Sequence, residues 1–419
     1  TEIKKIEEPE KERLRQLLSE RAKEALKLMS GTQTDDFSNK LREEAAFWIE
    51  RRDFTEERVR LELHIKNVKD LFPGKIKETE DNGFINFLYN VSMNILDLFK
   101  TLFHNFNSRA MKDATIAFKD HLDGGGKMML AMGGAMSSAQ MGVTLAAMIK
   151  EGKIHAVSCT GANLEESVFR LVAHDSYKDY PDYRYFTKED DEKILERGER
   201  RVTDTSIPEE EAFRVVEPII LKRWKEAEAK GERYFPHEYF YQILLSDELK
   251  DKYEGNPEHC WLLEAAKKNL PMVVPGWEDS TLGNIFAGYV KAGEVNVNVM
   301  KVGIEYMTAL YDQYQELSAG GPGLGFFQIG GGISGDFPIC VVPSIKYDLK
   351  KEVRPWGYFC QISDSTTSYG SYSGATPNEK ITWDKLTKDT PMFVIESDAT
   401  IVAPLIFEAI LDRYTLTKK

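Results

Sequence analysis

Short apolar runs alternate with segments long enough to form helices over most of the chain. The runs cover residues 128–132, 155–158, 272–274, 325–329, 358–362 and 392–395. A strand that is buried on both faces has a continuous apolar sequence, and two parallel strands need a long crossover, usually a helix. The alternation therefore predicts an α/β fold in which helices flank a parallel sheet.

The part of the chain before these runs has a helical composition. Residues 1–72 are rich in Glu, Lys, Arg, Leu and Ala, with Leu14, Leu17 and Leu18 at helical spacing. A second helical block, residues 82–122, is strongly apolar at its start and is stopped by D-G-G-G. We divide the chain into a helical N-terminal extension, residues 1–105, and an α/β domain, residues 106–419.

Residues 176–251 carry a high density of charge, with the sequences K-E-D-D-E-K-I-L-E-R-G-E-R-R and L-K-R-W-K-E-A-E-A-K-G-E-R. Such runs are typical of helices with a solvated face. We interpret this stretch as helices on the outside of the sheet, in preference to a binding surface.

Net charge and cysteine spacing exclude several classes of partner. The chain has 55 Lys and Arg against 68 Asp and Glu, a formal charge of −13, so its surface repels nucleic-acid phosphates. Its four cysteines are far apart and form no C-x-x-C pair, so we predict no metal site and reduced thiols in the cytoplasm. Because no apolar run is long enough to span a bilayer, we expect a soluble protein without membrane contact.

Two loops that follow predicted strands have the composition of a nucleotide site. The loop M-L-A-M-G-G-A-M-S-S-A-Q, residues 129–140, places paired glycines and then hydroxyls at the start of a helix, where free N–H groups hold a pyrophosphate. It is not a G-x-G-x-x-G motif, and close helix–strand packing explains it equally well. In S-C-T-G-A-N-L-E-E-S, residues 158–167, a glutamate can bind a ribose hydroxyl or simply favour a helix N-terminus.

Three further loops also follow predicted strands. They are P-G-W-E-D-S-T-L-G-N at 275–284, F-F-Q-I-G-G-G-I-S-G-D-F-P at 326–338 and E-S-D-A-T at 396–400. Three consecutive glycines permit close approach of backbone to ligand, or a sharp bend. The residues alone predict a large ligand at one edge of the sheet.

Covalent amine chemistry is indicated by residues 369–385, Y-G-S-Y-S-G-A-T-P-N-E-K-I-T-W-D-K. The segment supplies Glu379, Trp383 and Lys385 within seven positions. A lysine on a tryptophan face, partly shielded from water, has its ammonium form destabilised, and its neutral amine can then attack carbon. Composition alone favours an ordinary solvated lysine.

This segment resembles the signature S-D-S-G-A-R-P-D-E-A-V-S-W-G-K of the deoxyhypusine synthase family. The positions kept in register are Ser373, Gly374, Ala375, Pro377, Glu379, Trp383 and Lys385. The resemblance covers residues 106–411 and is patchy in the charged middle. It implies a Rossmann-like sheet, a homotetramer with active sites between chains, and a covalent imine on Lys385.

The resemblance also implies that the strand-end loops bind NAD. By position, the expected cofactor contacts are Gly134, Ala135, Met136, Ser138, Thr160, Gly161, Glu165, Glu166, Asp279, Gly331, Asp398 and Ala399.

The residues expected to hold the substrate depart from the family pattern. Asn284 stands where the family loop T-D-G-S-L-G-D has its last acid, Asp336 replaces a histidine of K-H-H, and Tyr372 replaces the acid of S-D-S-G. Together with Trp383 and Ser373 these form the expected substrate contacts. Each lost carboxylate removes a charge-assisted hydrogen bond to an ammonium, so spermidine is not assured as the donor.

Our first hypothesis is an NAD-dependent transferase that acts on a polyamine-type donor. NAD would take a hydride from the carbon bearing nitrogen, Lys385 would receive the imine, an acceptor amine would displace it, and the hydride would return. Glu379 would shuttle protons and Trp383 would pack on the alkyl chain. The acceptor is either a protein lysine or, as in homospermidine synthesis, a small diamine. The second hypothesis is a family member that binds NAD or a partner without turnover, which Asn284 and Tyr372 favour.

Overall fold

The computed structural model describes residues 94–365 and 376–413. The chain divides into two units, residues 1–91 and 92–419, and all of the first unit lies outside the described residues. Most of the predicted helical extension is in that unit. The boundary at residues 105 and 106 therefore stays a prediction, as does the extension itself.

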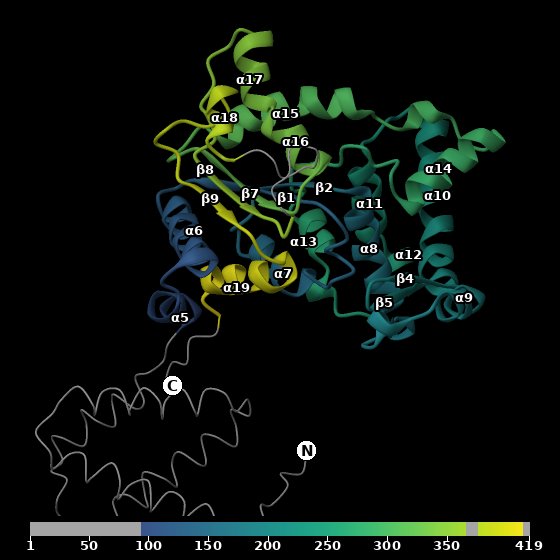
Figure 1. Ribbon diagram of the computed structural model, residues 1–419. Helices are drawn as coiled ribbons and strands as arrows, with labels where there is room; N and C mark the ends of the chain where they lie inside the picture. Colours follow the sequence, from purple (N-terminus) through teal and green to yellow (C-terminus); the bar gives the residue numbers. More distant parts are fainter. Residues whose placement is uncertain (1–93, 366–375, 414–419) are drawn as a thin grey trace, which may run out of the picture. The chain divides into compact units, whose positions relative to one another are not determined.

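A six-stranded parallel sheet forms the centre of the described unit, as the apolar runs predicted (Figure 1). Its strands are β1 (Lys127–Met132), β2 (Ala156–Cys159), β6 (Met272–Val273), β7 (Leu324–Ile329), β8 (Tyr358–Ile362) and β9 (Met392–Ile395). Every residue of β7 and β8 is buried, which explains why these strands are apolar throughout.

The strand order is β6-β2-β1-β7-β8-β9, and every neighbouring pair is parallel. From β1 the chain adds β2 and then β6 on one side of the sheet. It then adds β7, β8 and β9 in turn on the other side of β1. This is the doubly wound order, and its switch point lies between β1 and β7. In folds of this order, ligands bind beside the loops that leave the carboxyl ends of the two strands at the switch point.

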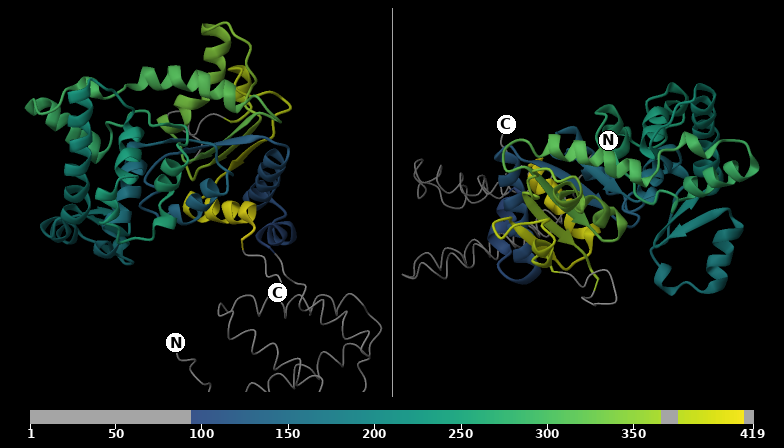
Figure 2. Two further views of the ribbon diagram at one scale, coloured as in Figure 1. Left: turned by 180° about the vertical axis from the view of Figure 1, so that it is seen from behind. Right: turned by 90° about the horizontal axis from the view of Figure 1, so that it is seen from above.

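Helices cover both faces of the sheet, as Figures 1 and 2 show from three directions. One face carries α5 (Ile95–Leu102), α6 (Phe106–Asp123), α7 (Gly142–Lys150) and α19 (Ala399–Leu411). The other carries α15 (Gly303–Leu317), α16 (Ile333–Ile339) and α17 (Val341–Pro343). The prediction of a helix-flanked parallel sheet is confirmed.

The second predicted helical block is interrupted in the structure. Its described part forms α5 and α6, and residues 103–105 between them are not helical. Asn94 caps α5 by accepting a hydrogen bond from the backbone N–H of Asp97 at 2.8 Å. The D-G-G-G stop is confirmed, because α6 ends at Asp123 and Gly125 adopts φ 83°.

The charged middle of the chain contains strands that the sequence analysis did not predict. An antiparallel sheet of order β3-β5-β4 is formed by β3 (Lys178–Asp179), β5 (Thr205–Pro208) and β4 (Glu199–Val202), beside α9 (Lys188–Glu196). The prediction of helices alone was wrong here. Glu199 is only 4% exposed, and Lys178 and Arg197 donate to it at 2.5 and 2.9 Å, so much of the local charge is neutralised within the sheet.

Further helices are drawn in teal and green in Figure 1, most of them at the β6 end of the sheet on the right, with the helix Trp261–Lys267 nearer the centre against α7. They are α8 (Gly161–Val172), α10 (Arg214–Lys230), α11 (Pro236–Leu244), α12 (Asp247–Lys250), α13 (Trp261–Lys267) and α14 (Thr281–Ala292). The charged helix α10 also has an apolar side, where Trp224 is fully buried against Phe286. Among the described residues, no helix is long and apolar enough to cross a membrane.

Candidate functional site

The glycine loops after β1 and β7 meet at the switch point. A Cβ on Gly133 would lie 2.6 Å from the carbonyl oxygen of Gly331, so this approach requires glycine. Gly332, at φ 79°, begins α16 and has no atom within 4 Å of the position of a Cβ. The two loops therefore approach each other through backbone atoms, and the open space at Gly332 permits a ligand to approach the backbone.

Asn163 of α8 fixes the loop after β1. Its side chain is fully buried, donates to the carbonyl of Gly134 at 2.8 Å and accepts from the N–H of Ser137 at 2.9 Å. The sequence analysis missed this residue. The sequence signal for Asn163 is an amide side chain in the first turn of a helix, between the turn residue Gly161 and the glutamates Glu165 and Glu166.

Thr160 and Gly161 join the second loop to its neighbours. Thr160 caps α8 by accepting from the N–H of Asn163 at 3.2 Å, and its hydroxyl donates to the carbonyl of Gly134 at 2.9 Å. A Cβ on Gly161 would lie 2.7 Å from the carbonyl oxygen of Trp277. The loop after β2 is thus in contact with the loops after β1 and β6.

Glu165 and Glu166 are both buried and both hold a neighbouring loop. Glu165 accepts from the N–H groups of Thr281 and Leu282 at 2.8 and 2.6 Å, which caps α14. Burial raises the pKa of Glu165 to about 7, against the opposing effect of these hydrogen bonds. Glu166 accepts from the hydroxyl of Ser138 at 2.8 Å, and burial raises its pKa too. Cofactor contact at these residues stays a prediction.

The loops after β6 and β9 complete the carboxyl edge. Asp279 is exposed, and the exposed Asn284 amide donates to the carbonyls of Glu278 and Ser280 at 3.0 and 2.6 Å. Asp398 caps α19, accepting from the N–H and the hydroxyl of Thr400, both at 2.7 Å. Two further predicted contacts are Ala399, which follows Asp398 and is half-buried, and Met136 in the loop after β1, which packs against the core.

The backbone of Lys385 lies at the opposite edge of the sheet. Its carbonyl accepts from the N–H of Trp356 at 3.1 Å, and Trp356 comes two residues before β8 begins. Within one chain the structure therefore does not bring the backbone of Lys385 to the loops at the carboxyl edge. Lys385 Nζ lies 5.8 Å from the ring centre of Trp383, near the outer limit of a cation–π contact, and that ring is 63% exposed.

The segment before Lys385 is held against the helical turn Ser344–Asp348, which follows α17. Asp384 has φ 57°, and its carboxylate accepts from Lys346 Nζ at 2.7 Å and from the hydroxyl of Tyr347. Glu379 is exposed in the first turn of α18 (Glu379–Thr382), and Asp336 is exposed on α16. The predicted contacts Tyr372 and Ser373 lie outside the described residues.

The family model described as deoxyhypusine synthase matches residues 94–410. The chain belongs to the deoxyhypusine synthase family. The match begins at α5, earlier than the start at residue 106 that the resemblance gave. It therefore spans the whole doubly wound sheet, the small antiparallel sheet and the lysine segment.

Curated relatives are similar over most of their length. A deoxyhypusine synthase-like protein of Nostoc punctiforme is 26% identical over 77% of this chain and 80% of its own. A probable deoxyhypusine synthase 2 of Methanosarcina mazei is 27% identical over 68% and 77%, and a probable deoxyhypusine synthase of Sulfurisphaera tokodaii is 23% identical over 84% and 99%. A solved putative deoxyhypusine synthase of Entamoeba histolytica, covering 77% of this chain and 94% of its own, is 12% identical at a TM-score of 0.44.

The departures from the family signature change the surroundings of Lys385. Asp384 stands where the signature has glycine, and its backbone has the left-handed φ of 57° that glycine adopts most readily. Lys380 stands where the signature has alanine, so this chain has two amines in the turn that ends at Lys385.

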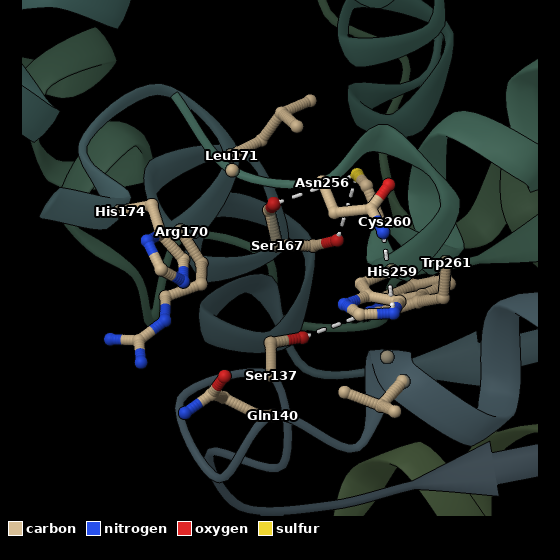
Figure 3. Close-up of a pocket in the computed structure, with 13 residues that line it drawn as sticks. Ser137, Gln140, Ser167, Arg170, Leu171, His174, Asn256, His259, Cys260 and Trp261 are labelled. Carbon is tan, nitrogen blue, oxygen red and sulfur yellow. Dashed lines mark hydrogen bonds between the residues drawn. The ribbon is translucent and has the colours of Figure 1, made fainter. Parts of the chain in front are cut away.

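A small cavity of about 50 Å³ lies behind the loop after β1, beside the carboxyl edge (Figure 3). Ser137 lines it and accepts from the indole N–H of Trp261 at 2.9 Å. Arg170, also in its lining, has its guanidinium 4.2 Å from the ring centre of Tyr177. None of the predicted site residues lines this cavity, and its volume is far below that of a dinucleotide.

Proposed function

We propose that this protein is an NAD-dependent transferase that moves an aminoalkyl group from a polyamine-type donor to an acceptor amine. Membership of the deoxyhypusine synthase family supports an aminobutyl transferase. The observation that carries the cofactor proposal is the doubly wound order, with glycine loops on both sides of its switch point.

The carboxyl edge has the features that NAD requires. The side-chain-free backbone at Gly331 and Gly332 permits close approach of a pyrophosphate, and the N-terminus of α8 supplies free N–H groups. Thr160 and Asp398 place polar atoms along the same edge. NAD, when bound, would accept a hydride from the donor and return it later in the reaction.

Lys385 would be the nucleophile of the transfer. Its amine would add to the imine carbon of the oxidised donor and hold the alkyl group until the acceptor amine displaces it. Glu379, exposed in the same segment, would carry protons between the amines. The open ring of Trp383 would pack along the alkyl chain.

We propose that the complete site forms between two chains of a homotetramer. The main chain at Lys385 and the carboxyl-edge loops lie at opposite ends of the strands in one chain, so a second chain would supply the missing half. The exposed side chains of Ile333, Ile401 and Leu405 near the carboxyl edge provide apolar area for such a contact. Light scattering that gives a 47.8 kDa monomer at micromolar concentration would rule out the shared site.

Calorimetry with NAD and assays with a panel of polyamines test the proposal. We expect NAD binding, alone or with an amine present, and release of a smaller amine from at least one donor. Lys385→Arg should abolish transfer and leave NAD binding nearly unchanged, because arginine keeps the charge but stays protonated. Undiminished transfer in Lys385→Arg would exclude the lysine mechanism, and absence of NAD affinity in every condition would exclude the cofactor.

A further inference from the structure

Asp384, the residue before Lys385, makes two contacts that the glycine of the family signature could not make. Its carboxylate accepts a hydrogen bond from Lys346 Nζ at 2.7 Å and another from the hydroxyl of Tyr347. These hydrogen bonds lower the pKa of Asp384, which favours the charged carboxylate. The backbone of Asp384 is left-handed, a conformation that is unfavourable for a residue with a side chain, so the two contacts hold the chain in a shape it would not adopt readily without them.

The two donors lie on the helical turn Ser344–Asp348, which is itself tied to the core of the domain. Ile345 of this turn is fully buried. The hydroxyl of Ser344 lies 2.6 Å from that of Tyr311 on α15, at hydrogen-bond distance. Asp384 is therefore bound to a part of the chain that packs on a long helix and not to a free loop.

The main chain at Lys385 is fixed on its other sides as well. Its N–H donates to the carbonyl of Lys380 at 3.1 Å, and its carbonyl accepts from the N–H of Trp356 at 3.1 Å. The next residue, Leu386, is only 2% exposed. The contacts of Asp384 thus complete a set that holds the backbone before, at and after Lys385.

We propose that Lys346, Tyr347 and Asp384 form a clamp that fixes the turn carrying Lys385 and thereby orients its amine. This inference rests on the proposed function, in which Lys385 is the nucleophile. The three residues would be positioning residues, because they act through Lys385. Since a misplacement of about 1 Å can slow a reaction about 100-fold, order in this turn bears directly on the rate of imine formation.

Hydrogen exchange of the full-length protein tests the clamp without any need for activity. Lys346→Met combined with Tyr347→Phe removes both donors. Exchange of the backbone N–H of Lys385 should then be about three- to tenfold faster, because each exposed contact is individually weak. Lys346→Arg keeps the ion pair and should exchange like the unmodified protein.

The control variant is Glu294→Gln. It breaks the ion pair of Lys225 and Glu294 at 3.1 Å, whose side chains are about as exposed as those of the clamp pair, and it should leave exchange at Lys385 unchanged. Equal exchange in the double variant and the unmodified protein would overturn the clamp.

Trapping of the lysine imine with a polyamine donor, NAD and borohydride tests the positioning role. The double variant should form the Lys385 adduct more slowly by about threefold or more, with unchanged NAD affinity by calorimetry, and Lys346→Arg should match the unmodified protein. Equal trapping rates despite faster exchange would overturn the positioning role. If the unmodified protein forms no adduct, the proposed transfer fails, and the exchange result alone decides whether the clamp fixes this turn.

Discussion

Replacing Glu199 by glutamine should destabilise the small antiparallel sheet. Glu199 is 4% exposed and accepts hydrogen bonds from Lys178, Tyr180, Arg197 and Ser206. Burial alone raises the pKa of Glu199, but the four donated hydrogen bonds outweigh it and lower the pKa to about 2, against an ordinary value of 4.5.

The size of the effect follows from that difference. At 1.36 kcal/mol per unit the shift corresponds to about 3 kcal/mol. Lys178 and Arg197 are 54% and 44% exposed, so solvent screening reduces the expected contribution to about 1–2 kcal/mol. Because the pKa is lower in the folded state, this stability is present above pH 4.5 and is lost as the pH falls towards 2.

Urea unfolding between pH 2 and pH 7 measures this contribution. Glu199→Gln should lose about 1–2 kcal/mol at pH 7 and converge on the unmodified protein at pH 2. Glu192→Gln is the control, since Glu192 is an exposed residue of α9 with its charge in solvent. A constant difference between Glu199→Gln and the unmodified protein over the whole pH range would refute the role of the carboxylate charge.

Three further substitutions test the carboxyl edge. For Glu165, the pKa in the folded state, about 7, exceeds the ordinary value of 4.5. The free energy of unfolding of the unmodified protein should therefore fall by about 3 kcal/mol as the pH rises from 4.5 through 7. Urea unfolding of Glu165→Gln should lack this decline. Gly133→Ala places a Cβ 2.6 Å from Gly331 and should weaken NAD affinity at least tenfold by calorimetry while the fold persists by circular dichroism. Asn284→Asp replaces an exposed amide donor by a carboxylate that faces two backbone carbonyls and should lower the free energy of unfolding by about 0.5–1.5 kcal/mol in urea, and an unchanged value would show that this amide is not structural.

The sheet could be predicted from the sequence because its strands are buried on both faces. That burial makes β7 and β8 continuously apolar, and each predicted strand end agrees with the structure within one residue. The loops at the carboxyl edge were predictable for the same reason, since parallel strands all end at one edge.

Other features depend on contacts between residues far apart in the sequence. The strand that contains Glu199 is charged, and its pairing with β5 and the hydrogen bond from Lys178 explain how Glu199 can be buried there. Asn163 could be seen as a polar residue in a helix, but not as the side chain that fixes Gly134. The position of Lys385 at the amino edge depends on its hydrogen bond with Trp356, for which its own segment gives no signal.

The most direct test of the proposed transfer is trapping of the intermediate. The protein is incubated with a polyamine donor, with and without NAD, then reduced with borohydride and mapped by peptide mass spectrometry. The proposal predicts an aminoalkyl adduct on Lys385 that requires both NAD and donor and is absent in Lys385→Arg. An adduct that forms equally well without NAD, or its absence with every polyamine although NAD binds, would contradict it.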